Sequence, residues 1–372
     1  MNILLVNWQD RLNPQAGGAE VHLFEIFSRL VARGHRVRLV CSGWPGAPAR
    51  AEVDGIEVRR TGGRHSFALR GRAAVRRALR AEAPDVVVED VNKLPLYLPA
   101  LTSGPFCTLI PHLFGTTAFR EADPASAGLV WLAEQGIPRG YARTGFHAIS
   151  ESTRDDLVAR GVPTERIRVI HPGVDVAAFT AADGARPGPP TFVYLGRLRR
   201  YKGVETAIRA AVLARHAVPG LRLLVAGQGD DRPRLERLAA GLGAGDGVRF
   251  LGFVDAATKL RLLRESTANV FPSPKEGWGM TVMEAAACAT PSLASDSPGL
   301  RDSVRDGLTG WLVPHGDPTA LAARMVELAL DSAQVARLGT AARRWAEDHS
   351  WEGAASATLA HLEELVQARP RP

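Results

Sequence analysis

Two glutamates, Glu276 and Glu284, mark the segment of this 372-residue chain that is best equipped for chemistry. Glu276 lies in a loop with two glycines, and Glu284 lies one turn inside a helix that is expected to begin near Met280. Glycine lets a ligand approach the backbone closely, and the free amides at a helix N-terminus attract an anion such as a diphosphate. Two carboxylates at such a junction can accept hydrogen bonds from sugar hydroxyls. The alternative is an acidic helix start followed by a surface glutamate.

A second loop offers cationic groups that suit phosphate oxygens. Arg197 and Lys202 lie between an apolar run at 192–195 and a helix expected from Gly203. Arginine supplies a planar fork of donors, and lysine supplies a point charge. A basic loop at a strand end is by itself more often solvated than functional. Together with the glutamate segment in the same half of the chain, it predicts a phosphate-binding site.

The positive charge of the chain is a weak guide to its partners. The net charge of +7 would favour a nucleic acid or an acidic membrane. However, 42 of the 46 basic residues are arginines, and arginine, alanine and glycine are all abundant, as in proteins from GC-rich genomes. Neither aromatic–basic interleaving nor a known nucleic-acid motif is found in the sequence. We therefore expect no nucleic-acid partner, and the four lysines become the more informative cations.

The composition is that of a globular protein with a substantial core. It is 45% hydrophobic and 23% charged, which excludes disorder as the main state and a small disulfide-stapled fold. The three cysteines have no metal-ligand spacing and are predicted to be buried residues in a reducing compartment. We find no signal peptide and no uninterrupted run of 18 apolar residues. These features predict a cytoplasmic protein, attached at most to the inner face of a membrane.

Apolar runs alternate with helical periodicity in two successive sets, which is typical of βαβ units in parallel sheets. In the first set strands are expected at 3–6, 37–41, 56–59, 85–89, 106–110, 145–149 and 167–170, and helices at 19–33, 67–82, 126–136 and 152–160. In the second set strands are expected at 191–195, 221–226, 248–251, 268–271, 292–295 and 310–313. Its helices are expected at 203–216, 231–241, 256–264, 280–289, 317–330, 333–347 and 351–367.

The pause between the two sets predicts the domain organisation. Residues 177–190 are rich in glycine and proline and lack a period, which is typical of a linker. We expect two Rossmann-like, doubly wound α/β domains, 1–172 and 173–349, that face each other across a cleft. A final helix within 350–372 would pack back on the first domain. Ligands of such sheets bind beyond the carboxyl ends of the strands, so two opposed edges suit a reaction between two substrates.

Four motifs together resemble the retaining nucleotide-sugar glycosyltransferases of family four, which have the two-domain GT-B fold. They are the Gly17-Gly18-Ala19-Glu20 loop, the VIHPGVD segment at 169–175, the GRL and YKG pieces of 196–203, and the E-x7-E pair with EGWGM. The motifs are spread over nearly the whole chain in the expected order. The resemblance implies transfer of a sugar from a nucleoside diphosphate to an acceptor hydroxyl, in natural-product, glycolipid or polysaccharide biosynthesis.

The resemblance also implies roles for individual residues in binding the donor. Arg197 and Lys202 would neutralise the diphosphate, Glu276 would contact the transferred sugar, and Glu284 would hold the ribose. Val254 matches the backbone position that reads the base. The remaining donor contacts that it implies, or that border the same pocket, are Gly17, Gly18, Gly229, Gly279, Met280 and Thr281.

His112 follows the strand expected at 106–110 and matches a histidine that faces the reacting carbon in the family. It would hydrogen-bond the transferred sugar or stabilise developing charge, and it joins Glu276 as a predicted catalytic residue. A purely structural histidine is the alternative.

The acceptor site is predicted less specifically. Glu89, Asp90 and Asn92 follow another strand of the first domain and are candidates for lining an acceptor pocket. Glu20 is either a partner of the helix dipole or an acceptor contact. The acceptor itself is expected to be a small molecule, a glycan or a lipid-linked molecule.

No Asp-x-Asp metal motif is found in the sequence, and cationic side chains with a helix N-terminus can do the work of a divalent metal. We therefore expect no metal site and no cofactor other than the nucleoside-diphosphate sugar as co-substrate. Two alternatives remain: a nucleotide-sugar epimerase or phosphorylase of the same fold, and a polyanion-binding protein.

An arginine cluster lies between Arg59 and Arg80. A solvated helix face is the ordinary explanation of such a cluster. The alternative is contact with an acidic acceptor or with an anionic membrane that carries a lipid acceptor.

Overall fold

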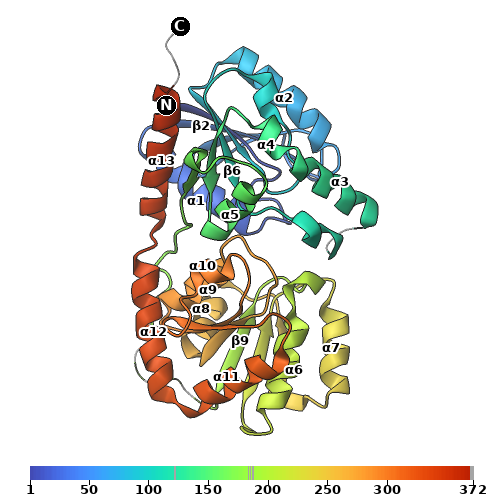
Figure 1. Cartoon of the computed structure of the whole chain (residues 1–372), viewed down its shortest axis with the longest axis vertical. Coiled ribbons are helices and arrows are strands. Elements are labelled where there is room, and N and C mark those ends of the chain that lie inside the picture. The colour runs from blue at the N-terminus through green and yellow to red at the C-terminus, as the bar shows by residue number, and fades with distance from the viewer. Residues whose placement is uncertain (121–122, 183, 185, 187, 369–372) are drawn as a thin grey trace. The chain divides into compact units, whose positions relative to one another are not determined.

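The computed structural model describes residues 1–120, 123–182, 184, 186 and 188–368 (Figure 1). The chain forms two compact units. Unit 1 consists of Met1–Gly173 together with the C-terminal segment from Trp351, and unit 2 consists of Val174–Ser350. Positions 183, 185 and 187 of the expected linker, and 369–372 of the expected final segment, lie outside the described residues.

Unit 1 is built on one sheet that has eight strands among the described residues, in the order β3-β4-β2-β1-β5-β6-β7-β8. The strands are β1 (Asn2–Val6), β2 (Arg36–Cys41), β3 (Arg50–Val53), β4 (Ile56–Arg60), β5 (Val86–Asp90), β6 (Phe106–Ile110), β7 (Gly145–Ala148) and β8 (Ile167–Val169). The α-helices are α1 (Gly18–Ala32), α2 (Phe67–Ala81), α3 (Pro124–Gln135), α4 (Ile137–Gly140), α5 (Glu151–Ala159) and α13 (Trp351–Gln367). Short 3-10 helices lie at Leu98–Leu101, Gly115–Arg120 and Thr164–Arg166.

Unit 2 has a sheet of six parallel strands in its described part, in the order β11-β10-β9-β12-β13-β14. The strands are β9 (Thr191–Leu195), β10 (Arg222–Ala226), β11 (Val248–Gly252), β12 (Ala268–Phe271), β13 (Ser292–Ser295) and β14 (Gly310–Val313). The α-helices are α6 (Val204–Ala214), α7 (Arg232–Gly241), α8 (Ala256–Glu265), α9 (Met280–Ala287), α10 (Leu300–Ser303), α11 (Pro318–Leu330) and α12 (Ser332–Glu347). Two 3-10 helices lie at Arg200–Lys202 and Gly245–Gly247.

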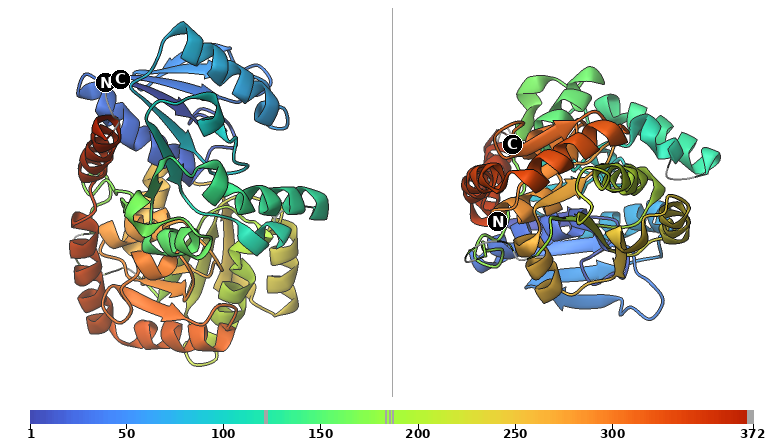
Figure 2. Two further views of the ribbon diagram at one scale, coloured as in Figure 1. Left: turned by 45° about the horizontal axis from the view of Figure 1, so that its top comes forward. Right: turned by 90° about the horizontal axis from the view of Figure 1, so that it is seen from below.

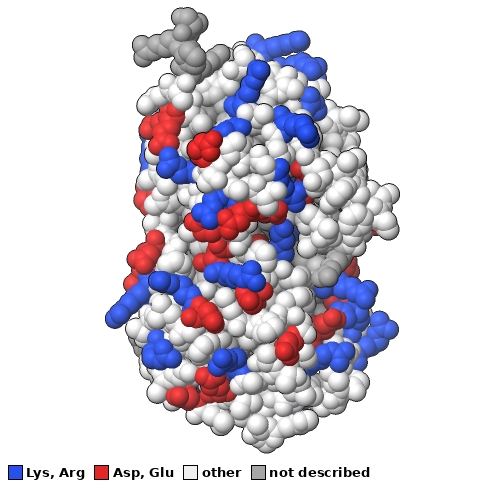
Figure 3. Space-filling model, in the orientation of Figure 1, with Lys and Arg blue, Asp and Glu red and all other residues white. Residues whose placement is uncertain are grey.

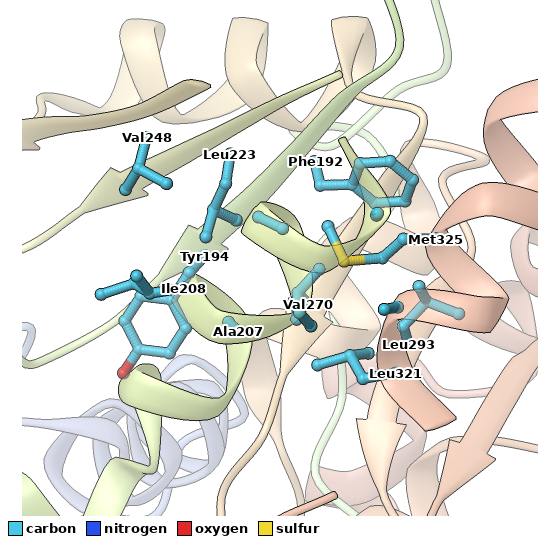
Figure 4. Close-up of a cluster of buried hydrophobic side chains, with 14 of the residues drawn as sticks. Phe192, Tyr194, Ala207, Ile208, Leu223, Val248, Val270, Leu293, Leu321 and Met325 are labelled. Atoms are coloured by element: carbon cyan, nitrogen blue, oxygen red, sulfur yellow. The ribbon is translucent and has the colours of Figure 1, made fainter. Parts of the chain in front are cut away.

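The central strand β9 shows why each sheet is covered on both faces. Its residues are apolar and buried almost without interruption, and alternate side chains enter two different cores. Phe192 and Tyr194 pack with α6 and α11, as Figure 4 shows, whereas Val193 and Leu195 pack with α8 and α9. The predicted doubly wound arrangement is therefore confirmed for this unit.

The strand order determines where a ligand can bind. In both sheets the order reverses beside the first strand of the unit, between β1 and β5 and between β9 and β12. In open α/β sheets ligands bind at the carboxyl ends of the strands at such a reversal point. Ligand-binding residues are therefore expected after β1 and β5 in unit 1, and after β9 and β12 in unit 2.

One strand was missed by the sequence pattern. β3 pairs antiparallel with β4 and adds an edge to an otherwise parallel sheet. The two strands are joined by Asp54 and Gly55, which both have positive φ. An Asp-Gly pair between two strands is a strong hairpin signal, and it could have identified this edge strand.

The C-terminal helix α13 lies alongside α1 in unit 1 (Figures 1 and 2). Arg33 at the end of α1 forms an ion pair with Glu352 of α13 and donates to Ser356 Oγ at 2.9 Å. Leu365 of α13 lies against Gly145, where an added Cβ would meet its side chain at 2.6 Å. The last helix of the chain is therefore part of the core of the first unit.

A group of buried histidines lies beneath α13. His22 of α1 stacks edge-on against His147 of β7, with 5.8 Å between ring centroids, and Trp351 lies 6.1 Å from His22. His361 of α13 interacts electrostatically with His147. Within the described residues, neither ring nitrogen of His22 or His361 has a hydrogen-bond partner. Burial lowers the pKa of all three histidines, and that of His22 falls to about 4.

We expect the free energy of unfolding of unit 1 to decrease as the pH falls from about 6.5 to 4, because over this range His22 binds a proton in the unfolded chain but not in the folded unit. The effect of His22 alone should approach about 3 kcal/mol near pH 4. His22→Leu should flatten this part of the profile. His65→Leu, which replaces an exposed histidine of the same unit, should not. Urea unfolding of both variants across this range measures the difference, and equal slopes would contradict the prediction.

Candidate functional site

An ion pair joins the two strand ends at the reversal point of unit 2. Lys202 follows β9, Glu276 follows β12, and Lys202 Nζ lies 2.5 Å from Glu276 Oε1. Both side chains are largely buried, at 12% and 14% exposure. The ammonium group also lies 5.7 Å from the ring centroid of Phe271. The structure thus brings together the predicted phosphate-binding lysine and the predicted sugar-binding glutamate.

Arg197 is presented on the surface of the same edge. Its side chain is exposed and has no ion-pair partner within the part of the chain that the structure describes. Its backbone is fixed, because the buried Tyr194 hydroxyl donates to the Arg197 carbonyl at 3.0 Å. The guanidinium group is therefore available for an external anion on a well-held loop.

The glycines after β10 are required by the packing of two loops. An added Cβ at Gly227 would lie 1.8 Å from the Gly196 carbonyl oxygen, and one at Gly229 would lie 1.9 Å from that of Leu198. The Leu198 amide donates to the Gln228 carbonyl at 2.8 Å. The predicted donor residue Gly229 thus has a structural reason to be glycine that is independent of any ligand.

The backbone around Glu276 is held from the other side by the segment after β13. The Glu276 amide donates to the Pro298 carbonyl at 3.1 Å, and Ser297 Oγ donates to the Ser273 carbonyl at 2.8 Å. Gly299 has φ +79°, and an added Cβ would lie 2.1 Å from the Glu276 carbonyl oxygen. The segment after β13 therefore fixes the backbone of Glu276 before any ligand is considered.

Helix α9 begins at the glycine-rich loop. Gly279 has the left-handed φ of +90° that glycine tolerates, and it directs the chain into the helix at Met280. The Val282 amide donates to the Gly279 carbonyl at 2.8 Å, which closes the first turn. The amides of Met280 and Thr281 lie in the first turn of α9, where amides have no partner within the helix. The positive end of the helix dipole is therefore close to Glu276 in the sequence.

Glu284 is paired with a lysine that the sequence analysis did not assign. Lys259 Nζ of α8 lies 2.5 Å from Glu284 Oε1. Burial raises the pKa of Glu284, and the positive charge of Lys259 opposes the increase. Val254, the predicted base-reading position, is half-buried and packs against the core beneath α8 and α9. The structure therefore places Lys259 beside a predicted donor residue.

The reversal point of unit 1 carries a polar network. Glu20 Oε2 accepts from the Gly17 amide at 2.7 Å, and its Oε1 accepts from Asn92 Nδ2 at 3.4 Å. Asn92 Nδ2 also donates to Asn7 Oδ1 at 2.7 Å. Glu20 therefore caps the start of α1, beside the half-buried Gly17 and the exposed Gly18. A contact of Glu20 with an acceptor remains a prediction.

The carboxyl groups of Glu89 and Asp90, which are adjacent at the end of β5, differ in their hydrogen bonding. Glu89 accepts hydrogen bonds from the Leu96 amide and the Tyr141 hydroxyl, at 2.7 and 2.8 Å, so it anchors the following loop. Asp90 is 2% exposed, and its carboxyl oxygens have no hydrogen-bond partner within the described residues. Burial, followed by the charge of Glu20, raises the pKa of Asp90 well above its usual value. Asp90 is thus the carboxyl group of this strand that remains uncommitted.

His112 follows β6 and is half-buried. Its ring lies edge-on to that of Phe114, with 4.8 Å between centroids. The structure therefore holds the imidazole at the carboxyl edge of the unit 1 sheet.

The predicted arginine cluster is smaller than its sequence suggests. Arg60 is buried, donates to Asp10 Oδ2 at 2.7 Å and lies 4.6 Å from the ring of Trp44. Arg72 donates to the Tyr97 carbonyl at 2.9 Å. The side chains that remain exposed are those of Arg59, Arg64, Arg70, Arg76, Arg77 and Arg80. Figure 3 shows basic side chains on the surface over α2.

A search of the described residues for groups of three or more histidine, cysteine, aspartate or glutamate side chains that could hold a metal ion finds none. No helix in the described part of the chain is long and apolar enough to cross a membrane.

Two family models together match most of the chain. One, described as Glycosyltransferase Family 4, matches residues 16–178, and the other, described as Glycosyl transferases group 1, matches residues 177–345. A glycogen synthase of Mycobacterium tuberculosis is 30% identical over 393 residues, with 96% of this chain and 93% of that protein covered. The chain belongs to the family 4 glycosyltransferases.

Other relatives and solved structures agree with this family. A D-inositol 3-phosphate glycosyltransferase of Streptomyces avermitilis is 37% identical over 274 residues, which span 68% of this chain and 58% of that enzyme. Sucrose-phosphate synthase of Thermosynechococcus elongatus has a TM-score of 0.85 at 22% identity, with 99% of this chain and 100% of that chain covered. Anabaena HepE, solved with UDP and glucose, has a TM-score of 0.78 at 17% identity, with 98% and 100% covered.

These comparisons confirm the predicted family, the glycosyltransferase class and the GT-B fold. They do not bear on the individual site residues, whose roles stay predictions. Lys259, which pairs with the predicted donor residue Glu284, is the residue at this site that the sequence motifs did not predict. A signal for it was available, because lysine is rare in this chain and Lys259 is one of only four.

We expect Gly229→Ala to destabilise unit 2 by about 1–3 kcal/mol, because its Cβ would overlap the Leu198 carbonyl and force two loops apart. Gly241→Ala is the matched control, since an added Cβ there meets nothing within 4 Å. Thermal and urea unfolding without ligand compare the two variants. If both melted like the wild type, the loop-packing explanation of Gly229 would be wrong.

Proposed function

We propose that this glycosyltransferase transfers a sugar from a nucleoside-diphosphate sugar to an acceptor hydroxyl with retention of anomeric configuration. The observation that carries the proposal is the Lys202–Glu276 pair at the strand reversal of unit 2. A sugar nucleotide offers complementary groups to both partners, since its diphosphate can pair with the ammonium and its sugar hydroxyls can donate to the carboxylate. Family membership supports the same reaction.

In this proposal unit 2 binds the donor. Arg197, Lys202 and the N-terminus of α9 stabilise the diphosphate, and their effect is greatest as negative charge develops on the leaving group. Glu276 and His112 contact the transferred sugar, and Glu284 accepts hydrogen bonds from the ribose. Val254, Gly229 and the first residues of α9 border the nucleotide. We propose that these cationic groups take the place of a divalent metal, and we propose no cofactor beyond the sugar nucleotide.

Unit 1 would bind the acceptor. The polar network at the ends of β1 and β5 supports this assignment, because Asn92 and Asp90 have acceptor atoms without hydrogen-bond partners within the described residues. Buried polar atoms of this kind favour a ligand that carries hydroxyl donors. Gly17 and Gly18 would let the donor phosphate and sugar approach the turn before α1. The acceptor class we propose is a small molecule, a glycan or a lipid-linked molecule.

We expect Lys202→Met and Glu276→Gln each to reduce transfer by at least about 100-fold, because each removes a charged contact that strengthens during reaction. The donor is first found by a thermal-shift screen of UDP-, GDP-, ADP- and dTDP-sugars, since a bound ligand raises the melting temperature. Release of nucleoside diphosphate from the selected donor then measures the rate.

The matched control for this experiment is Glu236→Gln, which removes an exposed carboxylate that pairs with Arg232 elsewhere in unit 2. It should retain wild-type activity, because exposed pairs contribute little. Circular dichroism and melting curves test whether the variants are folded. Near-wild-type rates for both Lys202→Met and Glu276→Gln would refute the proposed function.

We further propose that the exposed arginines of α2 contact an anionic membrane surface on the cytoplasmic side. Arg70, Arg76, Arg77 and Arg80 lie on this helix, and the apolar Leu69 beside them is 81% exposed. Basic side chains next to an exposed apolar group suit an anionic lipid surface.

The three cysteines are free and buried, which is compatible with a reducing compartment.

We expect sedimentation with vesicles of phosphatidylglycerol and phosphatidylcholine at low salt, and release at high salt. The double variant Arg76→Gln/Arg77→Gln should bind at least about tenfold more weakly, at roughly 1 kcal/mol per arginine. Arg209→Gln/Arg222→Gln, which removes two exposed arginines of unit 2, is the control. Absence of sedimentation at low salt would refute membrane contact and leave the transfer reaction unaffected.

A further inference from the structure

Two of the four lysines in this chain lie at the two glutamates of the E-x7-E pair. Only four lysines occur among 46 basic residues, yet Lys202 pairs with Glu276 and Lys259 pairs with Glu284, each at 2.5 Å. Lys202 already has a role in the proposed reaction. Lys259 lies on a different helix, α8, and no motif of the sequence assigns it a function.

The carboxyl group that Lys259 contacts is nearly enclosed. The Glu284 side chain is 15% exposed, and its Oε2 is buried without a hydrogen-bond partner among the described residues. Burial disfavours the charged form and raises the pKa of Glu284, while the charge and hydrogen bond of Lys259 lower it. Without Lys259, this carboxyl group would therefore take up a proton more readily.

Other charged groups near Glu284 are committed to different partners. Arg264 of α8 donates to the Thr180 carbonyl at 2.7 Å. Arg343 of α12 donates to the carbonyls of Phe179 and Ala287, at 2.8 and 2.6 Å. Cys288, one turn along α9, is a buried thiol whose pKa is raised to about 12 by burial, so it stays neutral. Lys259 is thus the cation that directly contacts Glu284 in the described part of the chain.

The ammonium group itself is held on two sides. It lies 5.3 Å from the ring centroid of Phe179, and the Phe179 amide donates to the Asp175 carbonyl at 2.8 Å. This ring packs against the core formed by α8 and α9. Lys259 is therefore held between an aromatic face and a carboxylate.

We propose that Lys259 is a positioning residue for the donor, which keeps Glu284 an oriented carboxylate whose second oxygen can accept hydrogen bonds from the ribose diol. The proposal rests on the proposed function for the identity of the ligand. It differs from a direct ligand contact, because Lys259 acts through Glu284. A protonated Glu284 would accept hydrogen bonds from the ribose more weakly than a carboxylate does. Without Lys259 the Glu284 side chain would also be free to rotate, and ordering it on binding would lower the affinity for the nucleotide.

The first test follows Glu284 without any ligand. The side-chain carboxyl signal of Glu284 is monitored by ¹³C NMR, assigned with Glu284→Gln, and titrated in the wild type and in Lys259→Met. We expect the midpoint to move to higher pH in Lys259→Met and to return toward the wild type in Lys259→Arg. An unchanged midpoint in Lys259→Met would overturn the proposal, whether or not a donor is known.

The second test measures dissociation constants for UDP, GDP, ADP and dTDP. For the nucleotide that the wild type binds best, Lys259→Met should raise the dissociation constant about tenfold at a pH below the Glu284 midpoint measured for this variant in the first test, and less at a pH above that midpoint, where Glu284 is ionised again. Lys259→Arg should restore most of the affinity. In a Glu284→Gln background, Lys259→Met should add less than about twofold. Arg261→Met, which removes an exposed pair with Glu265 on the same helix, is the control.

The outcomes separate the two proposals. If the wild type binds none of the four nucleotides, the proposed donor class is wrong, and the titration still decides whether Lys259 holds Glu284 ionised. If Lys259→Met weakens binding equally at both pH values and equally in the Glu284→Gln background, Lys259 contacts the nucleotide directly and the positioning role is refuted. Unchanged binding in Lys259→Met would refute it as well.

Discussion

The candidate site of unit 2 depends on one electrostatic requirement, which is that a carboxylate removed from water needs a cation beside it. Glu276 and Glu284 lie at a glycine-rich loop and the helix that follows it, and both are mostly buried. Lysines from two other segments meet this requirement. The loop that carries Lys202 packs closely against the loop that carries Glu276, since an added Cβ at Gly203 would lie 2.5 Å from the Pro272 carbonyl oxygen.

The parallel sheet explains why residues so distant in sequence can meet that requirement. Lys202 and Glu276 are 74 positions apart, but they follow β9 and β12, which are neighbours in the sheet and end at the same edge. The sequence predicted these strands well, because strands buried on both faces appear as continuous apolar runs. It missed the edge strand β3, whose RAEV sequence is polar and whose identity depends on its hairpin turn. Apolar runs in the sequence thus predict the buried strands, whereas the order in which the strands pair is seen only in the folded sheet.

The candidate site shows the same division between residue type and contact. The types and spacing of Glu276, Glu284 and Lys202 predict their place in the site, and the rarity of lysine draws attention to Lys259, but only the structure shows that each glutamate pairs with its own lysine. Glu89 and Asp90 are adjacent carboxyl residues that the sequence treats alike. Their side chains point to opposite faces of β5, so one anchors the loop at 96–98 and the other remains uncommitted. Such differences arise from three-dimensional packing and are not encoded in the residue type.

The arginines and lysines of this chain make different kinds of contact, because their cationic groups differ in geometry. Arg343 donates to three backbone carbonyls and Arg166 to two, which requires several donors in a fixed plane. These two arginines therefore anchor loops through their backbone contacts. A lysine ammonium is a compact charge with rotatable donors, and it can share its contacts between a carboxylate and a phosphate. This difference accounts for two of the four lysines lying at the two glutamates, where a cation must stabilise a carboxylate and leave it able to bind a ligand.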